Sequence, residues 1–282
     1  MHGSGPNDRD ETIGPNAPFR DLAIGLAARG IASLRYEKRT LELGQRFKVE
    51  VPDSTSEDEV VNDAVAAIAL LSKREEIGAV FVVGHSLGAA LAPRIAWRAA
   101  VQGIPVHGIV MLAAPLTPVH RLIIDQYAFL ASQAGSGITP EMIEDMRRRS
   151  GNVEKLLRLP NGAPSPGPLP FDVHASWWRD LGAYDPAATL LAQPKLPALL
   201  LFGGRDYQVP IGEKTLWAAR VESRPHTTLR EFPALNHLLM AGEGPPSPTE
   251  YGKPGKVADE LIDGVANWIA QISARAVPAA TR

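Results

Sequence analysis

The stretch that decides the fold is Val80-Phe81-Val82-Val83-Gly84-His85-Ser86-Leu87-Gly88-Ala89-Ala90. Its apolar, β-branched beginning predicts a buried strand, and the small residues at its end favour a helix. Between them lies the pattern G-x-S-x-G, in which glycine is needed on both sides because a Cβ there would collide with neighbouring backbone in so sharp a turn. The stretch therefore predicts a strained turn that presents Ser86 as a nucleophile at the carboxyl edge of a sheet.

Short apolar runs alternate with longer helical patterns along the rest of the chain. This alternation is typical of an α/β fold in which helices flank a mostly parallel sheet. The runs that predict strands are residues 31–36, 79–84, 106–113, 198–202 and 227–232. The helical patterns cover residues 19–29, 56–72, 87–101, 212–221 and 256–273.

One interval, residues 116–197, interrupts this alternation. Roughly eighty residues pass without a predicted strand, which is far longer than an ordinary connection. Helical patterns at 118–134, 140–149 and 175–181 are separated by a Pro/Gly-rich tract at 160–170. We predict a core of residues 1–115 and 198–282, and a helical cap of residues 116–197 over one face of the sheet.

A serine nucleophile needs a base to remove its proton and an acid to orient that base. In a sheet of this topology the acid follows the strand after the insertion, and the histidine follows the last strand. Asp206 lies just beyond the predicted strand 198–202, behind two glycines, and His237 lies in a loop after residues 227–232. We predict a triad of Ser86, Asp206 and His237, with the Leu87 amide as one donor to an oxyanion.

The remaining histidines and acids fit these roles less well. His85 leaves the turn in a different direction from Ser86 and is expected to pack, and His226 precedes a strand, at the opposite edge of the sheet. Asp185 precedes Pro186, as a helix N-cap does. The others are His107, within or before a strand, and His120, His174, Asp172 and Asp180 in the insertion, where the two histidines could touch substrate. No histidine pair has the spacing of metal ligands, so we predict neither a metal nor a cofactor.

Composition excludes several classes of protein. With 282 residues, of which 45% are hydrophobic, the chain can bury the core of one large domain. Its 29 basic and 31 acidic residues form no long block of like charge, so we expect no binding to nucleic acid or to an anionic membrane. Cysteine is absent, which excludes disulfides and a cysteine nucleophile. No apolar stretch reaches the roughly 20 residues that span a bilayer, and no signal peptide is evident, so a cytoplasmic location is the default expectation.

The chain resembles bacterial serine esterases of the α/β-hydrolase superfamily, in the subgroup with a helical cap and an HGSGPNDRDET-like segment. The resemblance spans nearly the whole chain. It is carried by residues 2–12 (HGSGPNDRDET), 34–39 (LRYEKR), 84–88 (GHSLG), 181–186 (LGAYDP), 203–209 (GGRDYQV) and 236–237 (NH).

The resemblance assigns a role to the N-terminal segment. In that superfamily a His-Gly pair follows the third strand, and a backbone amide just after it donates the second hydrogen bond to the oxyanion. By resemblance this donor is Ser4, with Gly3 as the alternative, and His2 is a structural residue of the loop. The charged residues 7–11 are expected to form ion pairs with Arg35, Lys38 and Arg39.

The sequence also departs from the family pattern. Family members place three strands, one of them central, before this segment, and these strands are missing here because the segment begins at residue 2. Residues 31–36 and 79–84 then either pair directly or leave a groove of unpaired backbone that another segment or chain fills. We expect a weakened fold, and a frayed N-terminus would remove an oxyanion donor, at a cost of about 10²–10³ in rate.

These observations predict a carboxylesterase that hydrolyses small apolar acyl esters through an acyl-enzyme. The predicted cap favours an enclosed pocket over an open cleft. Aromatic residues would line this pocket or pack the cap on the core: Tyr127, Phe129, Trp177, Trp178 and Tyr207. A triad also supports peptidase, thioesterase, lactone-opening or acyltransferase chemistry, and a vestigial binding protein without a complete oxyanion hole is the alternative of another class. The sequence leaves open whether the chain forms a homo-oligomer.

Overall fold

The computed structural model describes residues 1–276, and a parallel sheet lies at its centre. The sheet has four strands in the order β1-β2-β3-β4, and every neighbouring pair is parallel. The strands are β1 (Phe81–His85), β2 (Gly108–Leu112), β3 (Ala198–Gly203) and β4 (Thr227–Phe232). Each coincides with a predicted strand to within about two residues, the usual uncertainty of strand ends.

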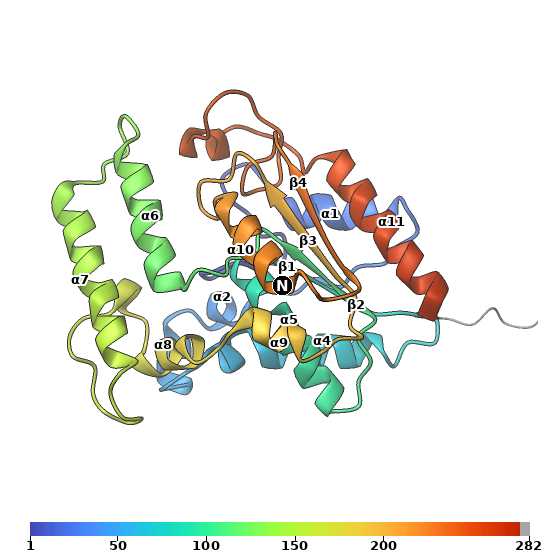
Figure 1. The fold of residues 1–282 in the computed structure, drawn as a ribbon, viewed down its shortest axis with the longest axis horizontal. Helices are drawn as coiled ribbons and strands as arrows, with labels where there is room; N and C mark the ends of the chain where they lie inside the picture. The colour runs from blue at the N-terminus through green and yellow to red at the C-terminus, as the bar shows by residue number, and fades with distance from the viewer. Residues whose placement is uncertain (277–282) are drawn as a thin grey trace, which may run out of the picture.

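Helices cover both faces of this sheet (Figure 1). Helix α5 (Leu87–Val101) packs on β1 and β2, and α1 (Pro18–Ala27) packs on α11 (Asp259–Ala276) across the opposite face. The helices that share the α5 face are α4 (Asn62–Leu71), α9 (Pro186–Leu191) and α10 (Gly212–Val221). The predicted α/β class, with helices flanking a parallel sheet, is confirmed.

Strand β2 shows why an uninterrupted apolar run forms the centre of such a sheet. Ile109 and Met111 join the core on the α5 side, whereas Val110 and Leu112 join the core beneath α1 and α11. All four side chains are completely buried. Because successive side chains of a strand point to opposite faces, a strand covered on both faces needs apolar residues at every position.

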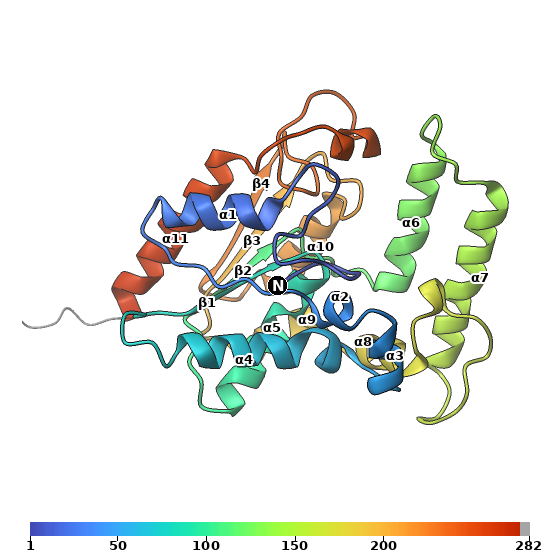
Figure 2. The ribbon, with the colours of Figure 1, turned by 180° about the vertical axis from the view of Figure 1, so that it is seen from behind.

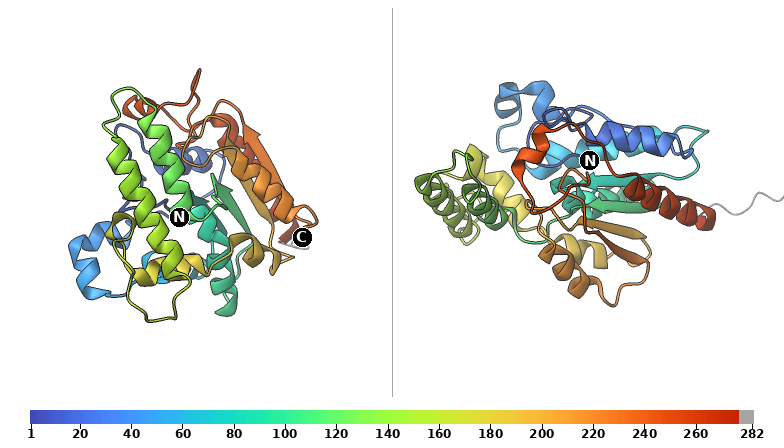
Figure 3. Two further views of the ribbon diagram at one scale, coloured as in Figure 1. Left: turned by 60° about the vertical axis from the view of Figure 1, so that its left-hand side comes forward. Right: turned by 90° about the horizontal axis from the view of Figure 1, so that it is seen from above.

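The residues between β2 and β3 are helical, as predicted. They form α6 (Val119–Ala131), α7 (Pro140–Leu156), the short 3-10 turn η2 (Pro170–Asp172), α8 (Ala175–Gly182) and α9. Figure 3 shows α6 and α7 lying side by side and projecting beyond the sheet on the side opposite to α11. The division of the chain into a core and a cap of residues 116–197 remains a prediction.

The predicted strand at residues 31–36 does not form. These residues are a coil that runs between α1 and α4 towards α2 (Arg39–Leu43), as Figure 2 shows from behind. A cavity of about 450 Å³ separates the coil from β1, and α1 and α4 line the same cavity. A strand requires a hydrogen-bonded neighbour, and across this cavity the coil has none among the described residues. Of the two predicted arrangements, direct pairing is thus wrong, and a groove is present.

The sequence also did not predict the short helices that follow this coil. They are α2 and α3 (Gln45–Glu50), and the predicted helix 56–72 begins with a π-helical turn, η1 (Glu57–Val61), before α4. No helix within residues 1–276 is both long enough and apolar enough to cross a bilayer.

The first residues of the chain lie against β1. The backbone nitrogen of Met1 donates to the Val83 carbonyl at 2.5 Å, and the Met1 carbonyl accepts from the His85 amide at 2.9 Å. These two bonds have the pattern of a parallel ladder. They place residues 2–5 beside the turn that follows β1.

Candidate active site

Ser86 lies in the sharp turn between β1 and α5. Its φ is 53° and its ψ is −119°, a conformation that non-glycine residues rarely adopt. Its amide donates to the Leu112 carbonyl at 2.9 Å. A Cβ on Gly84 would lie 2.3 Å from the Gly88 carbonyl oxygen, so the turn closes only with glycine there. Leu87 begins the 15-residue helix α5, and the amides of a helix's first turn have no partner within the helix.

Asp206 follows β3 and is fixed by its own loop. Its Oδ1 accepts from the amides of Gln208 at 2.8 Å and Val209 at 2.9 Å. Its other oxygen, Oδ2, lies 2.7 Å from Nδ1 of His237. Both side chains of this pair are buried, with exposed fractions of 0% and 5%. A carboxylate held in this way orients the imidazole and keeps its proton on Nδ1, which leaves Nε2 to act as a base.

The loop that carries His237 is held in place by close packing and hydrogen bonds. A Cβ on Gly203 would lie 2.4 Å from the Leu235 carbonyl oxygen, and one on Gly204 would lie 2.7 Å from that of Pro233. The Oδ1 atom of Asn236 accepts from the amides of Leu238 and Met240. The double glycine is therefore needed because the Asp206 and His237 loops approach each other so closely.

Arg205 and Glu250 connect this loop to the turn η3 (Pro248–Gly252). Arg205 is 8% exposed and donates to both carboxylate oxygens of Glu250. Glu250 in turn accepts from Nδ2 of Asn236 at 3.1 Å. Charge and hydrogen bonds from Arg205 and Asn236 outweigh burial and lower the pKa of Glu250 below its ordinary value.

His85 connects the serine turn to the His237 loop. Its Nε2 lies 2.9 Å from the His237 carbonyl, and the two imidazole rings are 4.5 Å apart. Because His85 immediately precedes Ser86, these contacts place the serine turn directly beside the His237 loop. Ser86 makes no side-chain hydrogen bond within residues 1–276, so the hydrogen bond from its hydroxyl to His237 is not formed in this structure. The place of Ser86 in the triad remains a prediction. His85 itself is 3% exposed and packed among other side chains, as expected.

The N-terminal loop presents its backbone to Ser86. A Cβ on Gly3 would lie 3.2 Å from Cβ of Ser86. The Gly3 amide is occupied, because it donates to Oε1 of Glu11 at 2.5 Å. The Ser4 amide has no acceptor among residues 1–276. Of the two predicted donors, Ser4 is therefore the one whose amide stays available for an oxyanion.

Two polar side chains hold the carbonyls of this loop. Nζ of Lys38 donates to the carbonyls of Gly3 at 3.1 Å and Gly5 at 2.9 Å. Nδ2 of Asn7 lies 3.1–3.3 Å from the carbonyls of Gly3, Ser4 and Gly5. The carbonyls are thus turned towards cations and amides, an arrangement that leaves backbone N–H groups for an anion.

His2, the first residue of this loop, packs in the interior and has a structural role. It is 5% exposed and packs against the rings of Phe19 and Tyr36. Burial lowers its pKa to about 4, so it is neutral near pH 7. A Cβ on Gly88 would lie 2.5 Å from the His2 carbonyl oxygen, so this glycine lets the loop pack on α5.

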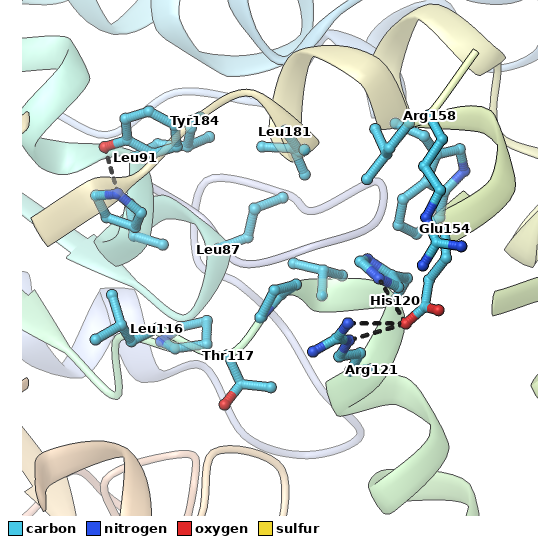
Figure 4. Close-up of a pocket in the computed structure, with 18 residues that line it drawn as sticks. Leu87, Leu91, Leu116, Thr117, His120, Arg121, Glu154, Arg158, Leu181 and Tyr184 are labelled. Carbon is cyan, nitrogen blue, oxygen red and sulfur yellow. Dashed lines mark hydrogen bonds and ion pairs between the residues drawn. The ribbon is translucent and has the colours of Figure 1, made fainter. Parts of the chain in front are cut away.

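A cavity of about 330 Å³ begins at Leu87 and extends beneath α6, α7 and α8. Figure 4 shows Leu87, Leu116 and Leu181 on one side of it and the polar group of His120, Arg121 and Glu154 on the other. Trp178 lines this cavity and is 2% exposed. The other aromatic residues proposed for an acyl pocket do not line this cavity: Tyr127, Phe129, Trp177 and Tyr207. Trp177 donates to Glu59, and the rings of Phe129 and Tyr207 stack with their centroids 4.5 Å apart.

The remaining histidines and acids weighed in the sequence analysis are bound to other parts of the fold or precede a strand. Asp185 caps α9, as predicted, because its Oδ1 accepts from the Ala188 amide at 2.9 Å. Asp180 binds Arg94 and Ser56 and so ties α8 to α5 and the start of η1. On the surface His174 pairs with Asp53, and Asp172 pairs with Arg149. His107 accepts from the Val80 amide. His226 precedes β4 and has a φ of 61°. Within residues 1–276 no three metal-ligating side chains gather into one group.

Of the three ion pairs predicted for the charged residues 7–11, with Arg35, Lys38 and Arg39, only the one with Arg35 forms. Arg35 pairs with Asp10, as expected, but Arg39 pairs with Asp63. Lys38 is buried and binds Oε1 of Glu59 at 2.6 Å, while Glu59 also accepts from Trp177. The HGSGPNDRDET and LRYEKR segments indicated that this part of the chain contains charged residues that pair with one another. Which of these side chains point into the interior depends on the tertiary structure.

A parallel sheet covered by helices on both faces, with a G-x-S-x-G turn after a strand and a helical insertion, defines the α/β-hydrolase fold. Comparison with known proteins agrees. Residues 2–250 match the alpha/beta hydrolase family, and the chain belongs to that family.

Esterase EstD of Thermotoga maritima is 38% identical over 272 residues, which cover 95% of this chain and 60% of that protein. The chain thus spans about three fifths of the length of this relative. Among solved structures, the Pyrococcus furiosus esterase Pf2001 has a TM-score of 0.55 at 14% identity, covering 97% of this chain and 80% of that one. Est1E from Butyrivibrio proteoclasticus has a TM-score of 0.55 at 14% identity, covering 96% and 85%. The structural similarities support the same fold.

Proposed function

We propose that the protein is a serine carboxylesterase of the subgroup with an HGSGPNDRDET-like segment, and that it acts on esters with small apolar acyl groups. The observation that carries the proposal is the buried 2.7 Å contact between Asp206 Oδ2 and His237 Nδ1, beside the strained turn that contains the half-buried Ser86. The similarity to a protein named as an esterase supports this choice among the reactions that a triad can perform.

In the proposed mechanism Ser86 Oγ attacks the ester carbonyl carbon while Nε2 of His237 takes the hydroxyl proton. Asp206 stabilises the imidazolium that results. The carbonyl oxygen becomes an oxyanion and accepts from the amides of Leu87 and Ser4. When the tetrahedral intermediate collapses, His237 gives its proton to the departing alkoxide, and an acyl-enzyme remains. Water, deprotonated by His237, then releases the carboxylic acid and restores Ser86.

The cavity beneath the proposed cap is the acyl pocket in this proposal. It starts at Leu87, one residue after the nucleophile, and its near wall is apolar. A volume of about 330 Å³ suits a short acyl chain. The polar group of His120, Arg121 and Glu154 lies across the cavity from Leu87 (Figure 4). It disfavours long hydrocarbon chains, because such a chain would displace water from the charged Arg121 and Glu154.

Labelling with a fluorophosphonate probe tests the nucleophile. We expect stoichiometric labelling at Ser86 that is lost in Ser86→Ala and strongly reduced in His237→Ala. Folded wild-type protein that takes no label would contradict the proposal and favour a non-catalytic binding protein.

A panel of p-nitrophenyl esters with acyl chains of increasing length, with matched amides and thioesters, tests the substrate class. We expect kcat/KM to be highest for short acyl esters. Faster turnover of the amides or thioesters would show that the protein is a peptidase or a thioesterase, and this result would not contradict the proposed triad.

A further inference from the structure

Glu11 and His85 form a buried ion pair beside the proposed triad. Oε2 of Glu11 lies 3.0 Å from Nδ1 of His85, and the two side chains are 3% and 4% exposed. Glu11 belongs to the N-terminal loop, and His85 directly precedes Ser86. Neither residue has a part in the chemical steps of the proposed mechanism.

Each member of the pair holds one component of the active site. The second oxygen of Glu11 accepts from the Gly3 amide at 2.5 Å, next to the Ser4 amide. The second nitrogen of His85 lies 2.9 Å from the His237 carbonyl and donates to it. A continuous chain of contacts therefore links the loop that offers the second oxyanion donor to the loop that carries the base.

The surroundings of the pair favour the charged form of each member. Burial would raise the pKa of Glu11, but the charge of His85 and the hydrogen bond from Gly3 outweigh it and hold that pKa below its ordinary value. Burial would lower the pKa of His85, but the charge of Glu11 raises it above its ordinary value. Nδ1 of His85 and Oε2 of Glu11 lie within ion-pair distance but are not aligned for a hydrogen bond, so their contact is one of charge. An imidazolium carries an N–H on both nitrogens, so His85 can attract Glu11 by its charge while its other nitrogen donates to the His237 carbonyl.

We propose that Glu11 and His85 act as a positioning pair that fixes residues 2–5 relative to the His237 loop. The inference rests on the proposed esterase function for its kinetic consequence, but its structural consequence can be measured without turnover. If Glu11 and His85 served only to fill the core, two apolar residues would do so without the cost of removing two charges from water.

Two substitutions of His85 separate the two contacts. The amide nitrogen of asparagine stands close to where Nδ1 of histidine would be, and that of glutamine close to Nε2. His85→Asn should therefore keep an N–H group beside Glu11 and lose the donor to the His237 carbonyl, whereas His85→Gln should keep the donor and lose the N–H group beside Glu11. Hydrogen exchange measured by mass spectrometry should accelerate at residues 236–240 in His85→Asn and at residues 2–5 in His85→Gln.

The kinetic prediction is a fall in kcat with little change in KM. A displacement of about 1 Å in an active site can cost roughly 10²-fold in rate, and we expect losses approaching this size in both His85 variants. Glu11→Gln keeps an oxygen for the Gly3 amide and removes the charge, so its kcat should fall less. Asp53→Asn is the matched control, because it breaks the exposed His174–Asp53 pair far from these contacts and should leave kcat and exchange unchanged.

Folded His85 variants with wild-type exchange in both segments and wild-type kcat would overturn the inference. A wild-type protein without ester turnover would contradict the proposed function instead, and the exchange pattern of the variants would still decide whether the pair positions the two loops.

Discussion

The two halves of the proposed active site are supported in different ways. Asp206 and His237 follow β3 and β4, and β3 is paired along both of its edges. Residues 2–5 lie beside β1, which pairs with β2 on one edge and, among the described residues, has only Met1 on the other. Strand β4 lies at the edge of the sheet, but all six of its residues pair with β3. The Asp206–His237 half is therefore supported by two strands paired along their whole length, and the N-terminal half by two backbone hydrogen bonds.

Side chains supply the support that the ladder lacks in the N-terminal half. Glu11 holds the amide of Gly3, and Lys38 and Asn7 hold the carbonyls of residues 3–5. Backbone ladders tolerate most substitutions because every residue carries the same groups. The comparison therefore predicts that substitution of Asp206 or His237 disturbs mainly the chemistry, whereas substitution of the side chains that hold residues 2–5 disturbs chemistry and stability together.

The largest expected effect is that of Asp206→Asn. An amide in place of the carboxylate favours the wrong tautomer of His237, and we expect kcat for a short-chain ester to fall by about 10⁴-fold. The melting temperature should change little, because an asparagine Oδ1 can still accept from Gln208 and Val209. Asp185→Asn, at the N-cap of α9, is the control and should leave kcat intact. Equal losses of kcat in both variants would show that Asp206 has no special role.

The second prediction concerns Lys38→Met, which removes the buried cation beneath the N-terminal loop. The Glu59 carboxylate then loses its ion-pair partner, and we expect the free energy of unfolding to fall by about 3 kcal/mol. If the Ser4 amide also loses its position, kcat should fall by about 10²–10³-fold. Both quantities can be followed, by urea titration and by ester hydrolysis.

The double variant Lys38→Met/Glu59→Gln separates the two effects. It removes the unpaired charge, so stability should recover in part while kcat stays low. Recovery of kcat together with stability would mean that Lys38 serves the fold alone.

The third prediction is a loss of stability in acid that depends on His2. Its pKa is about 4 in the folded protein and near 6.5 when exposed, so the unfolded chain binds the proton first. The contribution of neutral His2 to stability is therefore complete above about pH 6.5 and is lost as the pH falls towards 4, by on the order of 3 kcal/mol. His2→Gln should flatten the pH dependence of unfolding in this window. A variant with an unchanged slope would assign the acid sensitivity to other groups.

The smallest expected effect is that of Asn7→Ala. Asn7 is partly exposed, and each hydrogen bond of this type contributes about 0.5–1.5 kcal/mol. We expect kcat/KM to fall by up to about tenfold, with a slightly lower melting temperature. Asn161→Ala, in the exposed Pro/Gly-rich tract, should change neither quantity. A loss as large as that of Lys38→Met would show that Asn7, and not Lys38, is the main support of the loop.

Much of this architecture could be predicted because it depends on local patterns. The apolar run before Gly84 corresponds to strand β1. The glycines around Ser86 and the double glycine before Asp206 reflect close backbone approaches that the structure contains. The prediction of His237 followed from its place in the loop after the last predicted strand. The strand at residues 31–36 was predicted wrongly because its pattern is correct for a strand, but a strand also needs a partner, which no local pattern reports.

The side-chain network around residues 2–5 could not be predicted for a related reason. Glu11 and Lys38 look like ordinary surface charges in the sequence, yet they are 2% exposed in the structure. Their burial depends on partners such as His85 and Glu59, which are tens of residues away. The resemblance indicated that the segment matters, and the structure identifies which of its charges point inward.

The open edge of β1 also has a practical consequence. Apolar side chains line the cavity of about 450 Å³ beside it, among them Leu22, Ile68 and Val82. An unpaired strand edge next to an apolar surface can form backbone hydrogen bonds with an extended peptide from another molecule. Concentrated or warmed samples should therefore form β-rich aggregates that bind hydrophobic dyes, and a peptide long enough to lie along this edge should keep the protein in solution.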